Sequence, residues 1–134
     1  ALAFSSLLTV FQKEYIGKLS AFCGAVSASC AAGAAITYID GGTVKQIKDT
    51  IDNTLADIPG IICDGAKASC AAKIATAVES GLLGLNMYYN GNQFYAGDGI
   101  VKEDVESTIK SVSRLAHDGM RETDKEIIRI MLEE

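Results

Sequence analysis

The chain has 134 residues, of which 49% are hydrophobic and 22% charged, and its net charge is −5. This length favours one domain with a core large enough to fold without disulfides, and the negative charge argues against nucleic-acid binding, because phosphates need an excess of lysine and arginine. No basic segment precedes an apolar stretch with a cleavage site, so no signal peptide is evident. The chain also lacks the loop-rich, cysteine-dense composition of a small secreted scaffold, so we expect a cytoplasmic protein with free or metal-bound thiols. The chain starts at Ala1 inside a helical pattern, and we expect it to be part of a longer protein.

The first predicted element is an amphipathic helix that Gly17 loosens or ends. Apolar residues recur every three or four positions, as expected for one buried helical stripe. The residues of this stripe are Phe4, Leu7, Leu8, Phe11, Tyr15, Leu19 and Phe22.

Residues 19–39 carry no charge and consist largely of alanine, serine, glycine and cysteine. The segment is long enough to span a membrane, but such small residues contribute little apolar area. We therefore favour a buried central helix, against which neighbouring helices pack closely, over a transmembrane helix. Residues Asp40-Gly41-Gly42 would end this helix, since glycine adopts the left-handed conformation past a helix end.

Two further helices are predicted in the middle of the chain. Thr43 and Gln46 have the spacing of a capping box, and Pro59 ends the helix that they begin. The predicted buried face of this helix is Val44, Ile47, Ile51, Leu55 and Ile58. The next helix is expected to begin within residues 66–69 and to end near residue 85, with an inward face of Ile74, Val78, Leu82 and Leu85.

The last third of the chain is richer in charge, so its helices should be peripheral and solvated on one side. Residues 88–95 place aromatics around Asn90-Gly91, which fits a small hairpin and an ordered loop equally well. A helical stripe follows and ends at Gly119, and Thr123 with Glu126 predicts a second capping box that begins a last helix. The stripe consists of Val101, Val105, Ile109, Val112 and Leu115. The whole pattern predicts an all-α fold: a compact bundle of about five to six helices around the central small-residue helix, in one domain over residues 1–134.

Four cysteines, Cys23, Cys30, Cys63 and Cys70, are candidates for chemistry. No CxxC pair is present, which argues against a zinc ribbon or a thioredoxin-like redox motif. Thiolates in a reducing compartment suit iron–sulfur clusters, but cysteine is also a common buried core residue. The spacing of the cysteines alone favours the buried-core interpretation.

The segment IICDGAKASC, residues 61–70, follows the break at Pro59 and precedes a helix. A glycine turn before a helix N-terminus can hold an anion, and Lys67 adds a positive charge. Asp64, Gly65 and Lys67 are therefore candidates for binding a carboxylate substrate, although a solvated lysine after an Asp64 cap explains the pattern equally well. The single histidine, His117, fits a solvated or C-terminal capping residue better than a catalytic base.

At IICDGAK the sequence resembles the L-cysteine desulfidase group, which is related to the bacterial L-serine dehydratase α chain. Further matching segments are YIGKLSAFCGAV (15–26), AAGAAITYIDGG (31–42) and GIVKEDVESTIKSVSRLAHDGMRETDKEIIRIM (99–131). The last segment resembles the C-terminal end of that family. The chain is thereby identified as similar to the C-terminal portion of such a protein.

The resemblance implies a helical lyase that converts L-cysteine or L-serine to pyruvate, ammonia and sulfide or water. It implies a [4Fe–4S] cluster, with Cys23 and Cys63 as ligands, Cys70 as the third ligand, and Cys30 as a buried structural thiol. It implies an amino-acid substrate. The expected protein partners are the N-terminal portion of the same protein and further copies in a homo-oligomer. Binding to nucleic acid or to a membrane is not expected. The catalytic base stays unknown, and a further cysteine that the family has near its N-terminus has no counterpart here, so the fragment by itself is expected to be inactive. The alternative is a non-catalytic helical module with buried cysteines.

Overall fold

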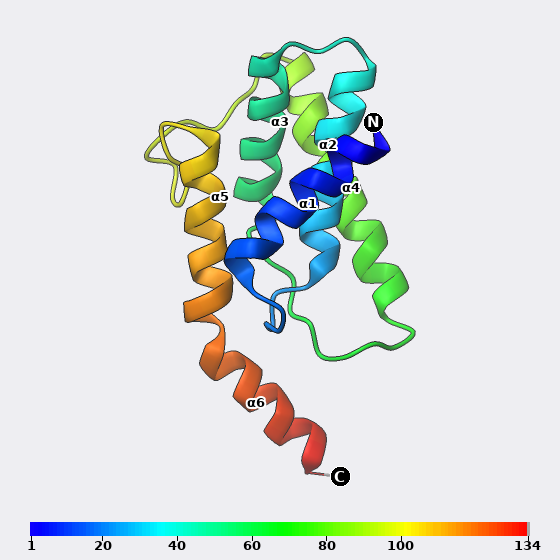
Figure 1. The fold of residues 1–134 in the computed structure, drawn as a ribbon, viewed down its shortest axis with the longest axis vertical. Helices are drawn as coiled ribbons and strands as arrows, with labels where there is room; N and C mark the ends of the chain where they lie inside the picture. Colours follow the sequence, from blue (N-terminus) through cyan, green and yellow to red (C-terminus); the bar gives the residue numbers. More distant parts are fainter. Residues whose placement is uncertain (134) are drawn as a thin grey trace.

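Six α-helices and one π-helical turn form the fold in the computed structural model, which describes residues 1–133 (Figure 1). No β-strand is present among these residues, and the predicted all-α bundle is confirmed. The helices are α1 (Leu2–Ile16), α2 (Gly24–Ile39), α3 (Val44–Asp57), α4 (Cys70–Tyr89), α5 (Val105–Arg114) and α6 (Arg121–Leu132), with the π-helical turn η1 (Leu115–Gly119) between α5 and α6.

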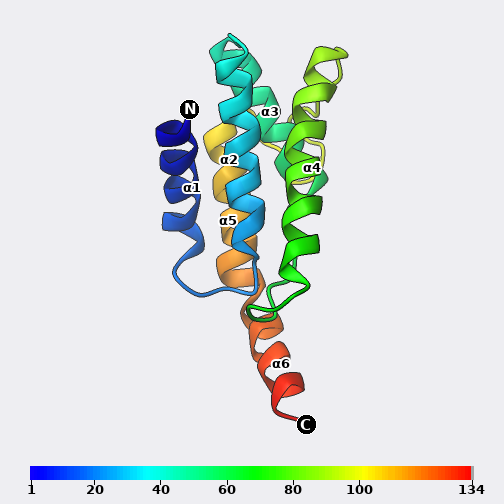
Figure 2. The same ribbon diagram turned by 90° about the vertical axis from the view of Figure 1, so that its right-hand side faces the viewer.

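Helix α2 lies at the centre of the bundle and packs against α1, α3 and α4 (Figure 2). Its small residues explain this position, because a glycine or alanine lets a neighbouring backbone approach closely. A Cβ atom on Gly33 would stand 2.8 Å from the carbonyl oxygen of Gly81 on α4. Within residues 1–133, no helix has both the length and the apolar character required to cross a bilayer.

Helix α1 ends where the sequence predicts, at Gly17, whose φ of +92° favours glycine. The predicted stripe is only partly buried, because Leu7 and Leu19 are exposed. Phe22 does not belong to this helix; it lies in the turn before α2 and is buried in the core. The loop after Gly17 therefore carries Phe22 into the core by a non-helical path.

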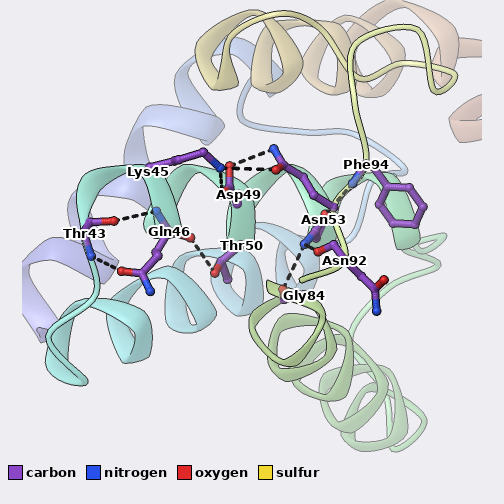
Figure 3. A network of polar contacts seen from close by, with 10 residues as sticks. Thr43, Lys45, Gln46, Asp49, Thr50, Asn53, Gly84, Asn92 and Phe94 are labelled. Carbon is purple, nitrogen blue, oxygen red and sulfur yellow. Dashed lines mark hydrogen bonds and ion pairs between the residues drawn. The ribbon is translucent and has the colours of Figure 1, made fainter. Parts of the chain in front are cut away.

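Helix α3 begins with the predicted capping box. The Gln46 amide donates to the Thr43 hydroxyl, and the Thr43 amide donates to the Gln46 side chain (Figure 3). Ile51 and Leu55 are buried as expected, whereas Val44 is exposed at the first position of the helix. The helix ends at Asp57, just before Pro59.

The predicted inward face of α4 is wrong at three of its four positions. Leu85 is buried, but Ile74, Val78 and Leu82 are exposed, Ile74 by 53%. The buried face of α4 consists instead of small residues: Ala77, Ser80, Gly81 and Gly84. Close approach to α2 and α3 decides the orientation, because only this face lets the backbones meet. A Cβ on Gly84, for example, would lie 2.9 Å from the Thr50 carbonyl oxygen.

Residues 90–104 form an ordered loop and not a hairpin. Asn53 on α3 holds this loop, because its side-chain amide donates to the carbonyl oxygens of Gly84 and Asn92 and its side-chain oxygen accepts from the Phe94 amide (Figure 3). A single buried polar side chain thus joins α3, α4 and the loop.

The C-terminal part combines a cap, a π-helical turn and a projecting helix. Asp104 caps α5 by accepting from the Ser107 amide, and the Ala116 carbonyl oxygen within η1 accepts from the Ser20 hydroxyl at 2.7 Å. Helix α6 buries none of its residues and extends away from the bundle (Figures 1 and 2). The second capping box is wrong: α6 begins at Arg121, so Thr123 lies inside the helix.

Candidate functional site

Two segments 40 residues apart in the sequence meet at the end of the bundle where α2 and α4 begin. Phe22 and Ile62 form an isolated antiparallel bridge. The Cys23 amide donates to the Ile61 carbonyl oxygen at 2.8 Å, and the Cys63 amide donates to the Ala21 carbonyl oxygen at 2.6 Å. This pairing fixes the backbones of Cys23 and Cys63 in adjacent segments.

Cys70, the first residue of α4, lies at the same end of the bundle. Its thiol donates to the Gly65 carbonyl oxygen at 3.7 Å. Cys23 and Cys70 also line one apolar groove of about 470 Å³, with walls formed by α2 and α4. Figure 2 shows these two helices side by side. Cys23, Cys63 and Cys70 are all partly accessible to solvent.

Cys30 differs from these three cysteines. It is fully buried in the core, and burial, reinforced by the nearby charge of Asp52, raises the pKa of its thiol to about 12. This position agrees with the structural thiol predicted from the sequence. Each of the four cysteines is a free thiol.

Asp64 is held by two lysines. It forms ion pairs with Lys67 and with Lys73, and the hydrogen bond from Lys67, followed by that from Lys73, holds the pKa of the Asp64 carboxyl well below its usual range. Its neighbour Gly65 has a φ of +92°, so the turn after Asp64 requires glycine. The three predicted carboxylate-binding residues therefore lie together in one turn, and Lys67 already forms an ion pair with Asp64.

Lys73 is the residue that sequence reasoning missed. It lies in the first turn of α4, and its ammonium group also donates to the Ile62 carbonyl oxygen at 2.7 Å. The hydrogen bond with Asp64 raises the pKa of Lys73, and the negative charges of Cys23 and Cys70 in their thiolate forms add to this rise. The sequence signal was its place three residues after Cys70, one helical turn further along α4.

A metal centre was predicted from Cys23, Cys63 and Cys70. Within residues 1–133, no three histidine, cysteine or acidic side chains lie close enough together to hold a metal ion. The pairing of the two segments, the shared groove and the nearby Lys73 nevertheless place three free thiols around one end of the bundle. Thiolates are the ligand type that iron–sulfur clusters require, so the chemistry of these three residues suits such a cluster, but their side chains do not form a ligand set in this structure. The role of each cysteine stays a prediction.

His117 lies in η1 and is exposed, as expected for a solvated residue. Its ring Nδ1 is 2.7 Å from the Asp118 carboxylate. Its ring also lies against the loop after α1, because a Cβ on Gly17 would stand 3.4 Å from His117 Cδ2. The structure thus gives His117 a local hydrogen-bond partner and a packing role.

The chain matches known proteins over almost its whole length. The family model described as "Serine dehydratase alpha chain" matches residues 1–129. A UPF0597 protein of Lachnoclostridium phytofermentans is 54% identical over 132 residues, which cover 98% of this chain and 32% of the relative. UPF0597 proteins of Desulfitobacterium hafniense and Treponema denticola are 54% and 51% identical, over 98% and 97% of this chain and 31% and 30% of their own lengths.

The chain therefore spans about a third of the length of these relatives. No solved structure matches it. Because the family model covers nearly every residue, including both cysteine segments, the chain belongs to the serine dehydratase alpha chain family.

Proposed function

We propose that this chain is the cluster-binding part of an iron–sulfur-dependent lyase that acts on L-serine or L-cysteine. The observation that carries the proposal is the pairing of residues 21–23 with residues 61–63, which holds Cys23 and Cys63 at the end of the bundle where Cys70 begins α4. Family membership supports a relation to serine dehydratases.

Cys23, Cys63 and Cys70 would hold a [4Fe–4S] cluster. With these three residues as ligands, a bound cluster would supply a Lewis acid for the leaving group on the substrate β-carbon. The overall reaction is an α,β-elimination that releases water from serine or sulfide from cysteine and leaves an aminoacrylate. One molecule of water then hydrolyses the aminoacrylate to pyruvate and ammonia, so the reaction of serine consumes as much water as it releases.

The residues around Asp64 would bind the substrate carboxylate. Lys67 and Lys73 bring two positive charges to the turn that Gly65 permits, and Asp64 holds both ammonium groups in place. A substrate carboxylate at this turn would accept hydrogen bonds from one or both lysines. Asp64 and Gly65 thus act by positioning these cations.

The rest of a full-length protein would complete the site. The relatives are about three times as long as this chain, and we propose that their additional N-terminal portion supplies the base that removes the substrate α-proton. The exposed apolar groove between α2 and α4 is a suitable surface for it, because Ile74 and Val78 leave that groove open. A cytoplasmic location and a homo-oligomeric state belong to the same proposal.

Anaerobic reconstitution with iron and sulfide tests the cluster ligands. The 134-residue chain and the full-length Lachnoclostridium phytofermentans relative should be treated in parallel, each as wild type and with the Cys63→Ser substitution or its equivalent. We expect broad visible absorption that Cys63→Ser abolishes and that Cys30→Ala, the matched control in the core, leaves unchanged. An unaltered spectrum in Cys63→Ser would refute the ligand assignment.

The same full-length preparation tests the reaction. Pyruvate formation should be measured separately with L-serine and with L-cysteine. Formation of pyruvate from at least one amino acid, lost with Cys63→Ser, is the expected result. A reconstituted relative that forms no pyruvate from either would contradict the lyase proposal.

A further inference from the structure

Lys67 and Lys73 both form an ion pair with Asp64, but their ammonium groups differ in what else they bind. Lys73 also donates to the Ile62 carbonyl oxygen at 2.7 Å, and its side chain is only 22% exposed. Lys67 binds Asp64 alone within residues 1–133, and its side chain is 47% exposed. The surroundings of the two lysines therefore suit two different tasks.

The two acceptors of Lys73 lie on either side of Cys63 in the sequence. The ammonium group binds the backbone of Ile62, the residue before Cys63, and the carboxylate of Asp64, the residue after it. Lys73 itself lies in the first turn of α4, three residues after Cys70. One ammonium group thus fastens the turn that carries Cys63 to the helix that begins with Cys70.

The same ammonium group is linked to the segment of Cys23. Ile62 forms the antiparallel bridge with Phe22, so the carbonyl group that Lys73 binds belongs to the residue that pairs with this segment. The charges of Cys23 and Cys70 in their thiolate forms raise the pKa of Lys73, which indicates that its ammonium group lies near both residues. Lys73 is therefore linked to all three segments that carry a partly accessible cysteine.

A further contact holds the turn to α4, but it depends on a protonated thiol. The Cys70 thiol donates to the Gly65 carbonyl oxygen at 3.7 Å, and a thiolate has no proton to donate. Metal binding requires the thiolate form, so this contact cannot persist if Cys70 serves as a ligand. The hydrogen bonds from Lys73 need no thiol proton, so they remain available in that state.

We propose that Lys73 is a positioning residue, which keeps the turn of Cys63 against the first turn of α4, and that Lys67 is the cation that receives the substrate carboxylate. An ammonium group has three N–H donors. Lys73 uses two of them within the protein, whereas Lys67 uses one and keeps two for a ligand that arrives from solvent. The assignment of Lys67 rests on the proposed function, whereas that of Lys73 rests on contacts within the chain.

Hydrogen exchange in the metal-free 134-residue chain tests the role of Lys73 without any reaction. The amides of Cys23 and Cys63 donate across the two paired segments, so their exchange rates, followed by two-dimensional amide NMR, report how often the pairing opens. Lys73→Met removes two charge-assisted hydrogen bonds and should speed the exchange of both amides at least about tenfold. Lys67→Met, the matched control, removes one exposed ion pair and should change these rates less than about threefold.

A conservative substitution separates the loss of the charge from the loss of the side chain. Lys73→Arg keeps a cation at the start of α4 and should return the exchange of both amides to within about threefold of wild type. Wild-type exchange in Lys73→Met would overturn the positioning role, as would equally fast exchange in Lys73→Met and Lys73→Arg.

The full-length Lachnoclostridium phytofermentans relative, substituted at the equivalent positions, tests both lysines in the proposed reaction. After anaerobic reconstitution with iron and sulfide, the Lys73→Met equivalent should show weaker visible absorption, which the Lys73→Arg equivalent restores. The Lys67→Met equivalent should keep the wild-type spectrum, and its KM for the amino acid should rise at least about tenfold, more than its kcat falls.

The opposite pattern would overturn the proposal: a lost spectrum in the Lys67→Met equivalent, or a raised KM with a full spectrum in the Lys73→Met equivalent. If the wild-type relative forms no pyruvate, the lyase proposal fails and the assignment of Lys67 falls with it. Hydrogen exchange in the 134-residue chain still decides the role of Lys73 in that case.

Discussion

Gly33 on α2 and Gly81 on α4 lie in direct backbone contact, so close that neither position has room for a side chain. A Cβ on Gly33 would stand 2.8 Å from the Gly81 carbonyl oxygen, and a Cβ on Gly81 would stand 2.7 Å from the carbonyl oxygen of Ser29. Both obstacles are backbone atoms of packed helices, which cannot move aside as a flexible side chain can.

Gly33→Ala should therefore lower the free energy of unfolding by about 1–3 kcal/mol, the usual cost of overpacking a well-packed core. The measurement is chemical denaturation followed by circular dichroism. Gly24→Ala is the control, because a Cβ at Gly24 meets no atom within 4 Å. That variant should be neutral or slightly more stable, since alanine is the better helix former. Equal destabilisation by the two substitutions would contradict the packing argument.

The capping box of α3 gives a second prediction. Thr43→Ala removes the acceptor for the Gln46 amide and should lower the free energy of unfolding by about 1 kcal/mol. Thr123→Ala is its matched control, because Thr123 has the same sequence pattern but lies inside α6. That change should stay within about 0.5 kcal/mol. A larger loss at Thr123 than at Thr43 would contradict the observed helix starts.

Asp52 makes stability depend on pH in an unusual direction. Its pKa is raised in the folded protein to about 6, mainly by burial, which a hydrogen bond from Thr108 partly offsets. The titratable groups that face it are Asp49, Asp104, Lys48 and Cys30. The folded state thus binds a proton more readily than the unfolded state, and stability falls as pH rises from about 4 through 6.

Asp52→Asn should remove this dependence. At pH 7 the free energy of unfolding of the variant should be about 1–2 kcal/mol higher than that of wild type. This value is smaller than the free energy that corresponds to the whole pKa shift, because the carboxyl lines an open cavity where solvent screens its charge. Below about pH 4 the difference should disappear, since the aspartate is then protonated in both states. Denaturation at a series of pH values checks this, and Glu103→Gln should keep the wild-type profile. A variant less stable than wild type at pH 7 would contradict a carboxylate that burial destabilises.

Thiol reactivity should separate Cys30 from the other three cysteines. Burial and a pKa of about 12 leave Cys30 neither accessible nor ionised at neutral pH, so it should react only when the protein unfolds. Cys23, Cys63 and Cys70 are partly exposed and should react in the native state. Alkylation with iodoacetamide under reducing conditions, followed by peptide mass spectrometry, gives the rate for each cysteine. Slow labelling of all four would instead support a non-catalytic module with buried cysteines.

The sequence predicted element type and number well, and it failed where packing decides orientation. The capping box at Thr43 and the stop at Gly17 follow from the local chemistry of single residues, whereas the buried Cys30 was proposed from the family resemblance. The face of α4 does not follow from local chemistry, because Ile74 and Val78 are the natural inward residues by hydrophobicity alone. Only the positions of α2 and α3 show that Gly81 and Gly84 must face them.

The residues of the candidate site could be proposed from the sequence, whereas the contacts between them could not. Cys23, Cys63 and Cys70 could be proposed from the resemblance, whereas the bridge between Phe22 and Ile62 is a tertiary contact without a sequence signal. Lys73 was missed because its partner Asp64 lies in a loop nine residues earlier, beyond the spacing of a single helix. Asp52 was missed because a polar residue on an amphipathic helix normally faces solvent.

The π-helical turn η1 sets the direction of the last helix. A π turn holds one residue more than an α turn, and each residue advances a helix by roughly 100°. Deleting one residue from Leu115–Gly119 would therefore swing α6 about a quarter of a revolution around the axis and withdraw the Ala116 carbonyl from Ser20. The Ser20 hydroxyl, from the loop after α1, thus joins the N-terminal part of the chain to the turn from which α6 extends.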